Sequence, residues 1–325
     1  MACGKAVQFC NDARLSYQFV QMCLYIHTVA AYILTYTPLI MFDFIVYVFS
    51  LRTKSVAFLA QGKILQCKMR FESVKDLPPV LQFLLVPLLP RIQKLLPLVI
   101  RCLVLFELFC GAAANTKALK DLGYNAEGFD KIRGSIEDIL EDSGYDLALF
   151  YTLCLLEGAS FWSGLECSTF IFMARNGTGR TICRPEGNYN CRRVRNANIM
   201  ASRSIALMTI AHLRNINTWM EQPFSSLAPH LEVVEVYINY VLLFQTTTFL
   251  GAYGGKYEKG IHVWSNSPEV ELLRRGRVSS HKKLAIKTKS GAVNGIKHSL
   301  NKSQRYPAKF GQQVAKIVRK LYLKK

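Results

Sequence analysis

Residues 104–115 read Val104-Leu105-Phe106-Glu107-Leu108-Phe109-Cys110-Gly111-Ala112-Ala113-Ala114-Asn115, an apolar run that gives way to small residues. This change predicts a buried strand followed by a tight turn. Residues 116–123 continue as a helix closed by glycine, and a second strand, 124–129, ends at Asp130. A strand, a small-residue turn, a helix, a second strand and a terminal acid make the first half of a nucleotide-binding unit.

The spacing within this unit bears on its ligand. Asp130 lies 19 positions after Gly111, close to the ~20 residues that separate the glycine turn from the acid that binds a ribose hydroxyl. A dinucleotide site, however, uses three glycines in the turn, and here only Gly111 is present. A nucleotide-type site and a buried strand–helix–strand unit without a ligand therefore both remain open.

Charge is unevenly distributed along the 325 residues. Of the net charge of +19, 16 positive charges belong to residues 274–325, which hold no acid, and this leaves +3 for residues 1–273. We therefore expect a basic C-terminal tail, 274–325, that binds nucleic acid or another anionic surface. Its residues 306–318 have the pattern of a short amphipathic helix that can pack back on the body.

The ten cysteines form no Cys-x-x-Cys pair, which favours a reduced, intracellular protein in the nucleus or cytoplasm. No His, Cys and Asp cluster has metal-ligand spacing, so we expect no metal.

The first 101 residues are predicted to be a hydrophobic extension and linker. Residues 19–50 contain a single acid and no Lys or Arg. They are long enough to cross a membrane, which would anchor the protein with the later domain on the cytoplasmic side. The alternative is an apolar extension that packs on the body. Residues 71–102 carry several prolines among leucines, which predicts a linker of short amphipathic pieces.

Residues 102–273 alternate between strand-like and helix-like patterns. Strands are expected at 159–165, 217–220 and 261–265, and helices at 145–156 and 196–214, whereas 233–249 is ambiguous. This alternation predicts an α/β domain with a parallel sheet. In such a sheet, ligands bind at the carboxyl ends of the strands. Three candidate positions each follow a predicted strand: Gly111 with Asp130, then Cys167, then Glu221. A thiol can attack an electron-poor ring, and a carboxyl group beside it can protonate or hydrogen-bond the ring nitrogen.

The order of these segments resembles the cytosine-5 DNA methyltransferases, within the S-adenosylmethionine-dependent Rossmann-like class. The resemblance covers about residues 103–268. It is carried by Leu105–Gly111, Glu127–Asp130, Asp138-Ile139, Ser163–Phe170, Glu221-Gln222-Pro223, Gly251–Gly254 and Ile261–Trp264.

This resemblance implies a Rossmann-like methyltransferase sheet with helices on both faces, S-adenosylmethionine as cofactor and nucleic acid, DNA rather than RNA, as partner. Cys167 would be the nucleophile on cytosine carbon 6, and Glu221 would meet the ring nitrogen. The implied cofactor-binding residues are Glu107, Phe109, Gly111, Asn115, Asp130 and Asp138. In this family the loop after the nucleophile closes over a flipped base, which implies phosphate contacts for Arg175, Arg180 and Arg184.

Several positions depart from the family pattern. Glu166 replaces the proline before the nucleophile, where a carboxylate opposes thiolate formation. Gln222 replaces asparagine, and Tyr257-Glu258-Lys259 stands where Gln-x-Arg-x-Arg is expected. The chain also has no room for a separate target-recognition domain. The alternative is a catalytically inactive methyltransferase fold that binds nucleic acid through its basic tail.

Overall fold

The computed structural model describes residues 72–278, 285–287, 293–295 and 305–324. These residues belong to one compact unit that begins at Gln66. The predicted membrane segment 19–50 lies outside the described residues.

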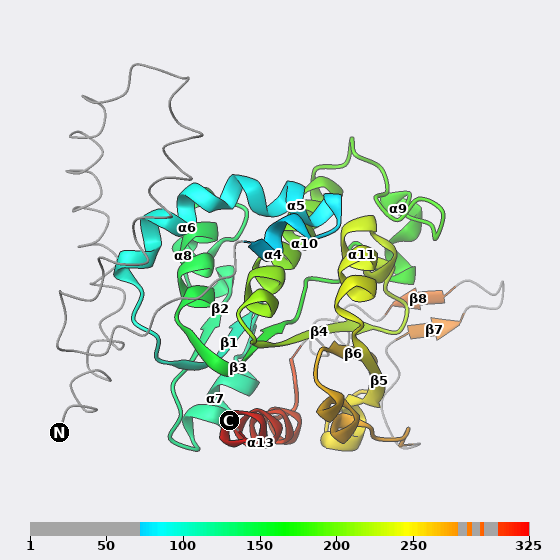
Figure 1. Cartoon of the computed structure of the whole chain (residues 1–325). Coiled ribbons are helices and arrows are strands. Elements are labelled where there is room, and N and C mark those ends of the chain that lie inside the picture. The colour runs from blue at the N-terminus through cyan, green and yellow to red at the C-terminus, as the bar shows by residue number, and fades with distance from the viewer. Residues whose placement is uncertain (1–71, 279–284, 288–292, 296–304, 325) are drawn as a thin grey trace, which may run out of the picture. The chain divides into compact units, whose positions relative to one another are not determined.

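A six-stranded sheet forms the centre of this unit (Figure 1). The strands are β1 (Leu103–Leu108), β2 (Ala126–Phe129), β3 (Leu155–Ser163), β4 (Asn217–Pro223), β5 (Phe244–Phe249) and β6 (Gly260–Ser265), in the order β2-β1-β3-β4-β6-β5. β1 to β4 are parallel, as predicted, and every residue of β1 is buried. The α/β class is confirmed, and the arrangement is compatible with a Rossmann-like fold.

The sheet is mixed, however, because β6 runs antiparallel to both β4 and β5. A parallel crossover needs a dozen or more residues and usually a helix. The connection 250–259 between β5 and β6 holds only the 3-10 helix η8 (Leu250–Tyr253). The chain therefore turns back on itself here, so the prediction of a fully parallel sheet was wrong at this edge.

Helices cover both faces of the sheet (Figure 1). On one face lie α7 (Ala114–Lys120) and the C-terminal α13 (Ala308–Leu323), and on the other lie α8 (Asp142–Leu153), α10 (Arg192–Leu213) and α11 (Glu232–Val241). The remaining elements are η4 (Lys131–Arg133), η5 (Ser135–Glu137), η6 (Phe172–Ala174), α9 (Arg175–Thr178), η7 (Ala228–His230), η9 (Pro268–Leu273) and the antiparallel pair β7 (Ala285–Lys287) and β8 (Val293–Gly295).

The proline-rich segment is a chain of short helices packed on the domain. It comprises α4 (Glu72–Lys75), α5 (Pro79–Leu85), η2 (Val86–Leu88), α6 (Leu89–Leu95) and η3 (Leu96–Leu98). From α5 onward each piece has a proline at its first or second position, where the missing N–H costs nothing. α5 packs on α10 and α11, and α6 packs on α8. The body therefore begins before residue 102.

Among the described residues, one helical stretch, Pro79–Leu98, is long and apolar enough to cross a membrane by length and composition alone. Its side chains Leu81, Leu85 and Ile92 are buried against the domain.

The C-terminal helix α13 is part of the core. Phe310, Val314, Ala315, Ile317 and Val318 are buried on its inner face. A Cβ atom on Gly311 would lie 2.4 Å from the carbonyl oxygen of Ala114, so only glycine allows α13 to approach α7 this closely. The predicted amphipathic helix is confirmed, but residues 308–323 belong to the domain and not to a separate tail.

Candidate cofactor and catalytic site

The candidate site lies where the direction of strand order reverses. From β1 the chain passes through α7 to β2 on one side, and then through α8 to β3 on the other side of β1. Leu108 at the end of β1 is paired with Ser163 at the end of β3, and Ser163 is paired with Met220 of β4. Open α/β sheets bind ligands outside the carboxyl ends of strands at such a switch point.

The turn after β1 is conformationally strained. Phe109, Gly111 and Ala113 all have left-handed backbone angles, with φ of 58°, 51° and 55°. Two of these residues carry a Cβ, and non-glycine residues persist in this region only where the surroundings enforce it, which is common in ligand-binding turns. The N–H of Gly111 donates a 2.9 Å hydrogen bond to Oδ2 of Asp130. Asp130 thus fastens the turn of β1 to the end of β2.

Glu107 is a carboxyl group buried beneath this turn. Its Oε2 accepts hydrogen bonds from the N–H and the hydroxyl group of Thr116, at 2.9 and 2.6 Å. Burial raises the pKa of Glu107 to about 7, although the bonds from Thr116 act in the opposite direction. Its Oε1 is buried without a hydrogen-bond partner among the described residues.

Further buried polar atoms at the same edge lack hydrogen bonds. Within the described part of the chain, both side-chain polar atoms of Asn115 and Oγ of Ser163 make none, and Oε1 of Glu221 makes none although it lies in an ion pair with Lys259. Asn115 is the second residue of α7, Ser163 ends β3 and Glu221 lies near the end of β4. Buried polar groups in native proteins are almost always paired. Their convergence at the switch point indicates a site for a polar ligand.

Cys167 and Glu221 are brought into electrostatic range of one another, together with Lys259. Nζ of Lys259 lies 3.7 Å from Oε1 of Glu221. Burial raises the pKa of the Cys167 thiol, the positive charge of Lys259 lowers it, and the negative charge of Glu221 raises it. Burial would lower the pKa of Lys259, but Glu221 and Cys167 hold it above its ordinary value. The sequence indicated Lys259 only as a departure from the family pattern.

Glu166 has a smaller effect on the thiol than its position suggests. It is exposed, and Oε1 accepts a 2.7 Å hydrogen bond from the hydroxyl group of Ser168. Its charge raises the pKa of Cys167, but burial and the charges of Lys259 and Glu221 all act more strongly.

Gln222, another departure, joins β4 to the nucleophile loop. Its Nε2 donates to the carbonyl oxygen of Leu165 at 2.8 Å, and its Oε1 accepts a 2.6 Å hydrogen bond from the hydroxyl group of Ser226. The side chain is fully buried. Gln222 therefore holds the segment that carries Cys167 against the strand that carries Glu221.

Tyr306, from the segment before α13, was not expected at this site. Its hydroxyl group donates a 2.8 Å hydrogen bond to Oε2 of Glu221. The hydroxyl oxygen of Tyr306 also lies 2.9 Å from the position that a Cβ on Gly164 would take, so Tyr306 reaches the end of β3 as well as β4. Burial and the charge of Glu221 raise the pKa of Tyr306 well above its ordinary value, so its hydroxyl group remains a donor.

The three arginines after the nucleophile have different surroundings. Arg180 is 1% exposed. It donates to the side chain of Asn198 at 2.9 Å and lies over the ring of Phe170 at 3.8 Å. Burial lowers its pKa to about 10. Arg180 thus supports the nucleophile loop from inside, which corrects the expectation of a phosphate contact. Arg175 is half-buried over Phe172, and Arg184 is exposed.

Asp138 lies in the loop after β2, where its Oδ1 accepts a 3.0 Å hydrogen bond from the N–H of Leu140.

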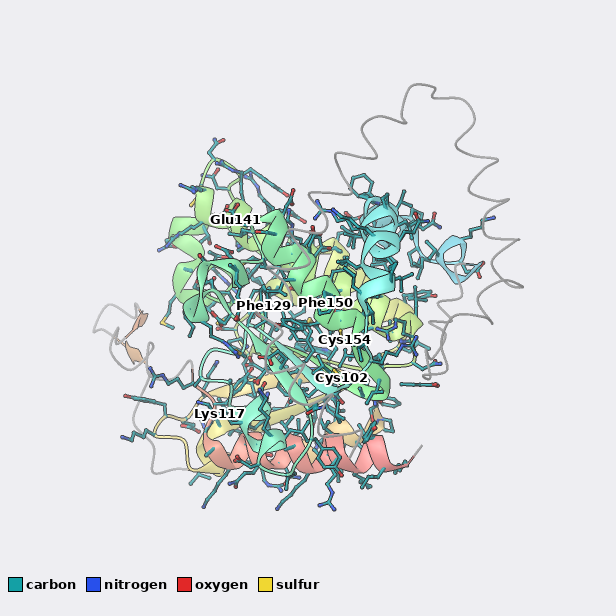
Figure 2. The ribbon with its side chains drawn as sticks, turned by 90° about the vertical axis from the view of Figure 1, so that its left-hand side faces the viewer. Cys102, Lys117, Phe129, Glu141, Phe150 and Cys154 are labelled. Carbon is teal, nitrogen blue, oxygen red and sulfur yellow. The ribbon has the colours of Figure 1, made fainter. Side chains whose placement is uncertain are left out.

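Burial raises the pKa of Cys110 to about 12, which makes it a poor nucleophile. Cys102 and Cys154 lie side by side at the other end of the sheet from Phe129, which ends β2 (Figure 2). Among the cysteines that the structure describes, Cys167 is thus the thiol best placed for chemistry at the switch point.

No group of three or more His, Cys, Asp or Glu side chains in the described ranges could hold a metal ion. Neither the models of known protein families nor the curated proteins contain a match to this chain.

Proposed function

We propose that this chain is an S-adenosylmethionine-dependent methyltransferase that acts on a nucleic-acid base, a cytosine in DNA, with Cys167 as nucleophile. The observation that carries the proposal is that buried polar atoms of Glu107, Asn115 and Ser163 lack hydrogen bonds at the switch point, on the same edge of the sheet as Cys167, Glu221 and Lys259. A polar cofactor site thus adjoins a thiol–carboxylate pair, as methyl transfer to an electron-poor ring requires.

The buried residues fit the polar groups of the cofactor. The free Oε1 of Glu107 suits the ammonium group of the methionine moiety. Asn115, the second residue of α7, has a buried side chain without hydrogen bonds that suits the carboxylate of that moiety. Asp130 and Asp138 suit the ribose hydroxyls and the adenine edge. When bound, the cofactor supplies a methyl group on a positively charged sulfur.

The chain's own residues would perform the remaining steps. The thiol of Cys167 would pass its proton to Oε1 of Glu221, since Oε2 is held by Tyr306, and Lys259 favours the thiolate by its charge. As Sγ bonds to carbon 6, Glu221 would give this proton to the ring nitrogen, which leaves an electron-rich ring. Once carbon 5 is methylated, its proton would pass to water and the bond to Sγ would break with its electron pair returning to Sγ. The proton on the ring nitrogen would then return to the thiolate through Glu221.

The sheet itself also favours this function over a dinucleotide site. A dinucleotide-binding sheet continues as parallel strands on both sides of the switch point, whereas here β6 is inserted antiparallel between β4 and β5. The antiparallel β6 therefore argues against a dinucleotide-binding sheet. Fold analogy alone does not assign function, so the argument depends on the site.

Covalent trapping tests the nucleophile. A DNA oligonucleotide that carries 5-fluorocytosine, incubated with S-adenosylmethionine, should form an adduct that survives denaturing electrophoresis. Cys167→Ser should abolish the adduct, whereas Cys183→Ser, at an exposed cysteine of the same loop, should preserve it. No adduct with the wild-type chain, or an equal adduct with Cys167→Ser, would refute the catalytic proposal.

The second candidate is an inactive methyltransferase fold that binds nucleic acid through residues 274–304. The raised pKa of Cys167 favours it. Because α13 completes the core, the test is substitution of the basic residues in 274–304 by glutamine and not deletion of the tail. Salt-sensitive binding that disappears on substitution, without any trapped adduct, would support this candidate. Membrane anchoring through 19–50 is tested separately, by carbonate extraction with and without residues 1–70.

A further inference from the structure

An open groove of about 820 Å³ lies next to the candidate site. One wall is formed by the connection between β5 and β6, from Leu250 to Lys259, and the other by residues 305–309, from Arg305 to Lys309. The walls meet where a Cβ on Gly255 would lie 3.1 Å from Cγ of Pro307. The groove thus depends on the contact between the β5–β6 connection and the segment that leads into α13.

The charge of this groove is positive. Its lining contains Lys256, Lys259, Arg305 and Lys309 and no acidic residue. Lys259 is paired with Glu221, but the other three are exposed and form no ion pair with any described residue. α13 begins at Ala308 on the same wall, and its N-terminal end adds partial positive charge. The groove is therefore built to receive negative charge.

Both walls of the groove lead into the candidate site. Lys259 is 3.7 Å from Oε1 of Glu221, and Tyr306, between Arg305 and Pro307, donates to Oε2 of the same carboxylate. A polyanion in the groove would therefore place one of its units beside Glu221 and Cys167.

We propose that this groove binds the phosphate backbone of a single nucleic-acid strand on either side of the base presented to Cys167. The inference rests on the proposed function and names its substrate-binding surface. The volume is that of a ligand-sized pocket, which holds a few nucleotides of one strand and not a duplex. The loop expected to make phosphate contacts contributes no residue to this groove, and Arg180 of that loop is buried.

Salt-dependent binding of a fluorescent single-stranded oligonucleotide tests the groove. In the triple variant Lys256→Gln, Arg305→Gln, Lys309→Gln, the slope of log K against log salt should decrease by about 2, since each charge on a single strand contributes about 0.7. With binding at 1 M salt as reference, this corresponds to a roughly 50-fold loss of affinity at 0.15 M. The matched control is Lys94→Gln, Lys316→Gln, Lys320→Gln, at exposed positions outside the groove, and it should keep the wild-type slope.

Photo-crosslinking locates the strand directly. An oligonucleotide with 5-iodouracil should crosslink to peptides from 250–259 and 305–309, and the triple groove variant should lose these crosslinks. Equal slopes in the two triple variants, or crosslinks confined to 274–304, would contradict the proposal that the strand binds in the groove. Thermal unfolding should show that both variants are folded.

Cofactor binding separates this inference from the proposed function. S-Adenosylmethionine should bind the wild-type chain and the groove variant equally in calorimetry, because none of the three substituted residues belongs to the cofactor site. If the cofactor binds but the strand avoids the groove, the inference fails alone. If the cofactor does not bind and the strand occupies the groove, the proposed function fails and the groove remains.

Discussion

The hydroxyl group of Tyr306 is hydrogen-bonded to Oε2 of Glu221 at 2.8 Å, across 85 positions of sequence. This bond connects the segment before the last helix to the end of β4. It leaves Oε1 of the same carboxylate in an ion pair with Lys259 at 3.7 Å and without a hydrogen bond to any described residue. Tyr306 therefore fixes which oxygen of Glu221 can receive a substrate.

Tyr306→Phe should reduce methylation by roughly 10- to 100-fold, because a hydrogen bond to a charged group contributes about 1.5–3 kcal/mol. Affinity for S-adenosylmethionine should be unchanged. Tyr237→Phe is the matched control, since this buried hydroxyl group of α11 donates to the side chain of Thr218 and lies outside the groove. Steady-state methylation and calorimetry give the two readouts. Equal activity losses in both variants would show that Tyr306 acts only through stability.

Glu107 should make stability fall between about pH 4.5 and 7. Its pKa is raised from 4.5 to about 7 by burial, so within this interval the folded chain holds a proton that the unfolded chain has lost. The free energy of unfolding therefore decreases by up to about 3 kcal/mol as pH rises through this range, and the effect levels off above pH 7. Urea denaturation from pH 4.5 to 8 should show that Glu107→Gln lacks this component.

The comparison of wild type with Glu107→Gln cancels the contributions of other titrating groups. Glu235→Gln, at an exposed position of α11, should follow the wild-type curve. A Glu107→Gln curve parallel to that of the wild type across this range would mean that Glu107 does not retain its proton in the folded chain.

Lys259 should control the reactivity of Cys167. Its positive charge lowers the pKa of the thiol against the larger effect of burial, so Lys259→Gln should shift the pH profile of Cys167 alkylation by iodoacetamide to higher pH. Glu221→Gln should shift the profile to lower pH, because a negative charge is removed. Lys256→Gln, on the neighbouring groove wall, is the control and should leave it unchanged. Identical profiles in the wild type and the three variants would show that the charge of Lys259 does not affect the pKa of the Cys167 thiol.

Gly311→Ala should test the place of α13 in the core. The added Cβ would stand 2.4 Å from the carbonyl oxygen of Ala114, so α13 must move away from α7, at a cost of about 1–3 kcal/mol. Cofactor affinity should also fall, because the start of α7 carries Asn115. Gln312→Ala, at the exposed next position, should change neither. A Gly311→Ala chain with wild-type thermal stability would contradict this packing.

Local pattern predicted the first unit of the fold and the order of the strand ends. The small residues after Leu108 predicted the turn, whereas the hydrogen bond from Gly111 to Asp130 is a contact that the spacing did not indicate. Cys167 and Glu221 could be placed on one edge because parallel strands end together. Strand β5 was missed because the segment 233–249 has no clear period, and the antiparallel direction of β6 was missed with it.

Contacts made across long sequence distances could not be predicted in this way. Nothing near Tyr306 indicates that its hydroxyl group reaches Glu221, because that contact depends on how α13 packs against α7. The burial of Arg180 likewise depends on acceptors up to 18 positions away, at Asn198 and elsewhere. An arginine in a polar loop has the same local pattern whether it faces phosphate or supports the loop.

Calorimetric titration with S-adenosylmethionine tests the central proposal most directly. The wild-type chain should bind the cofactor at micromolar concentration and release a proton at pH 6.5, because the ammonium group would lower the pKa of Glu107. Glu107→Gln should lose the proton release, and Asp130→Ala should bind at least about tenfold more weakly. Asp121→Ala, exposed at the end of α7, should bind like the wild type. No binding at high micromolar concentration, or equal binding by Asp130→Ala, would contradict a cofactor site at this switch point.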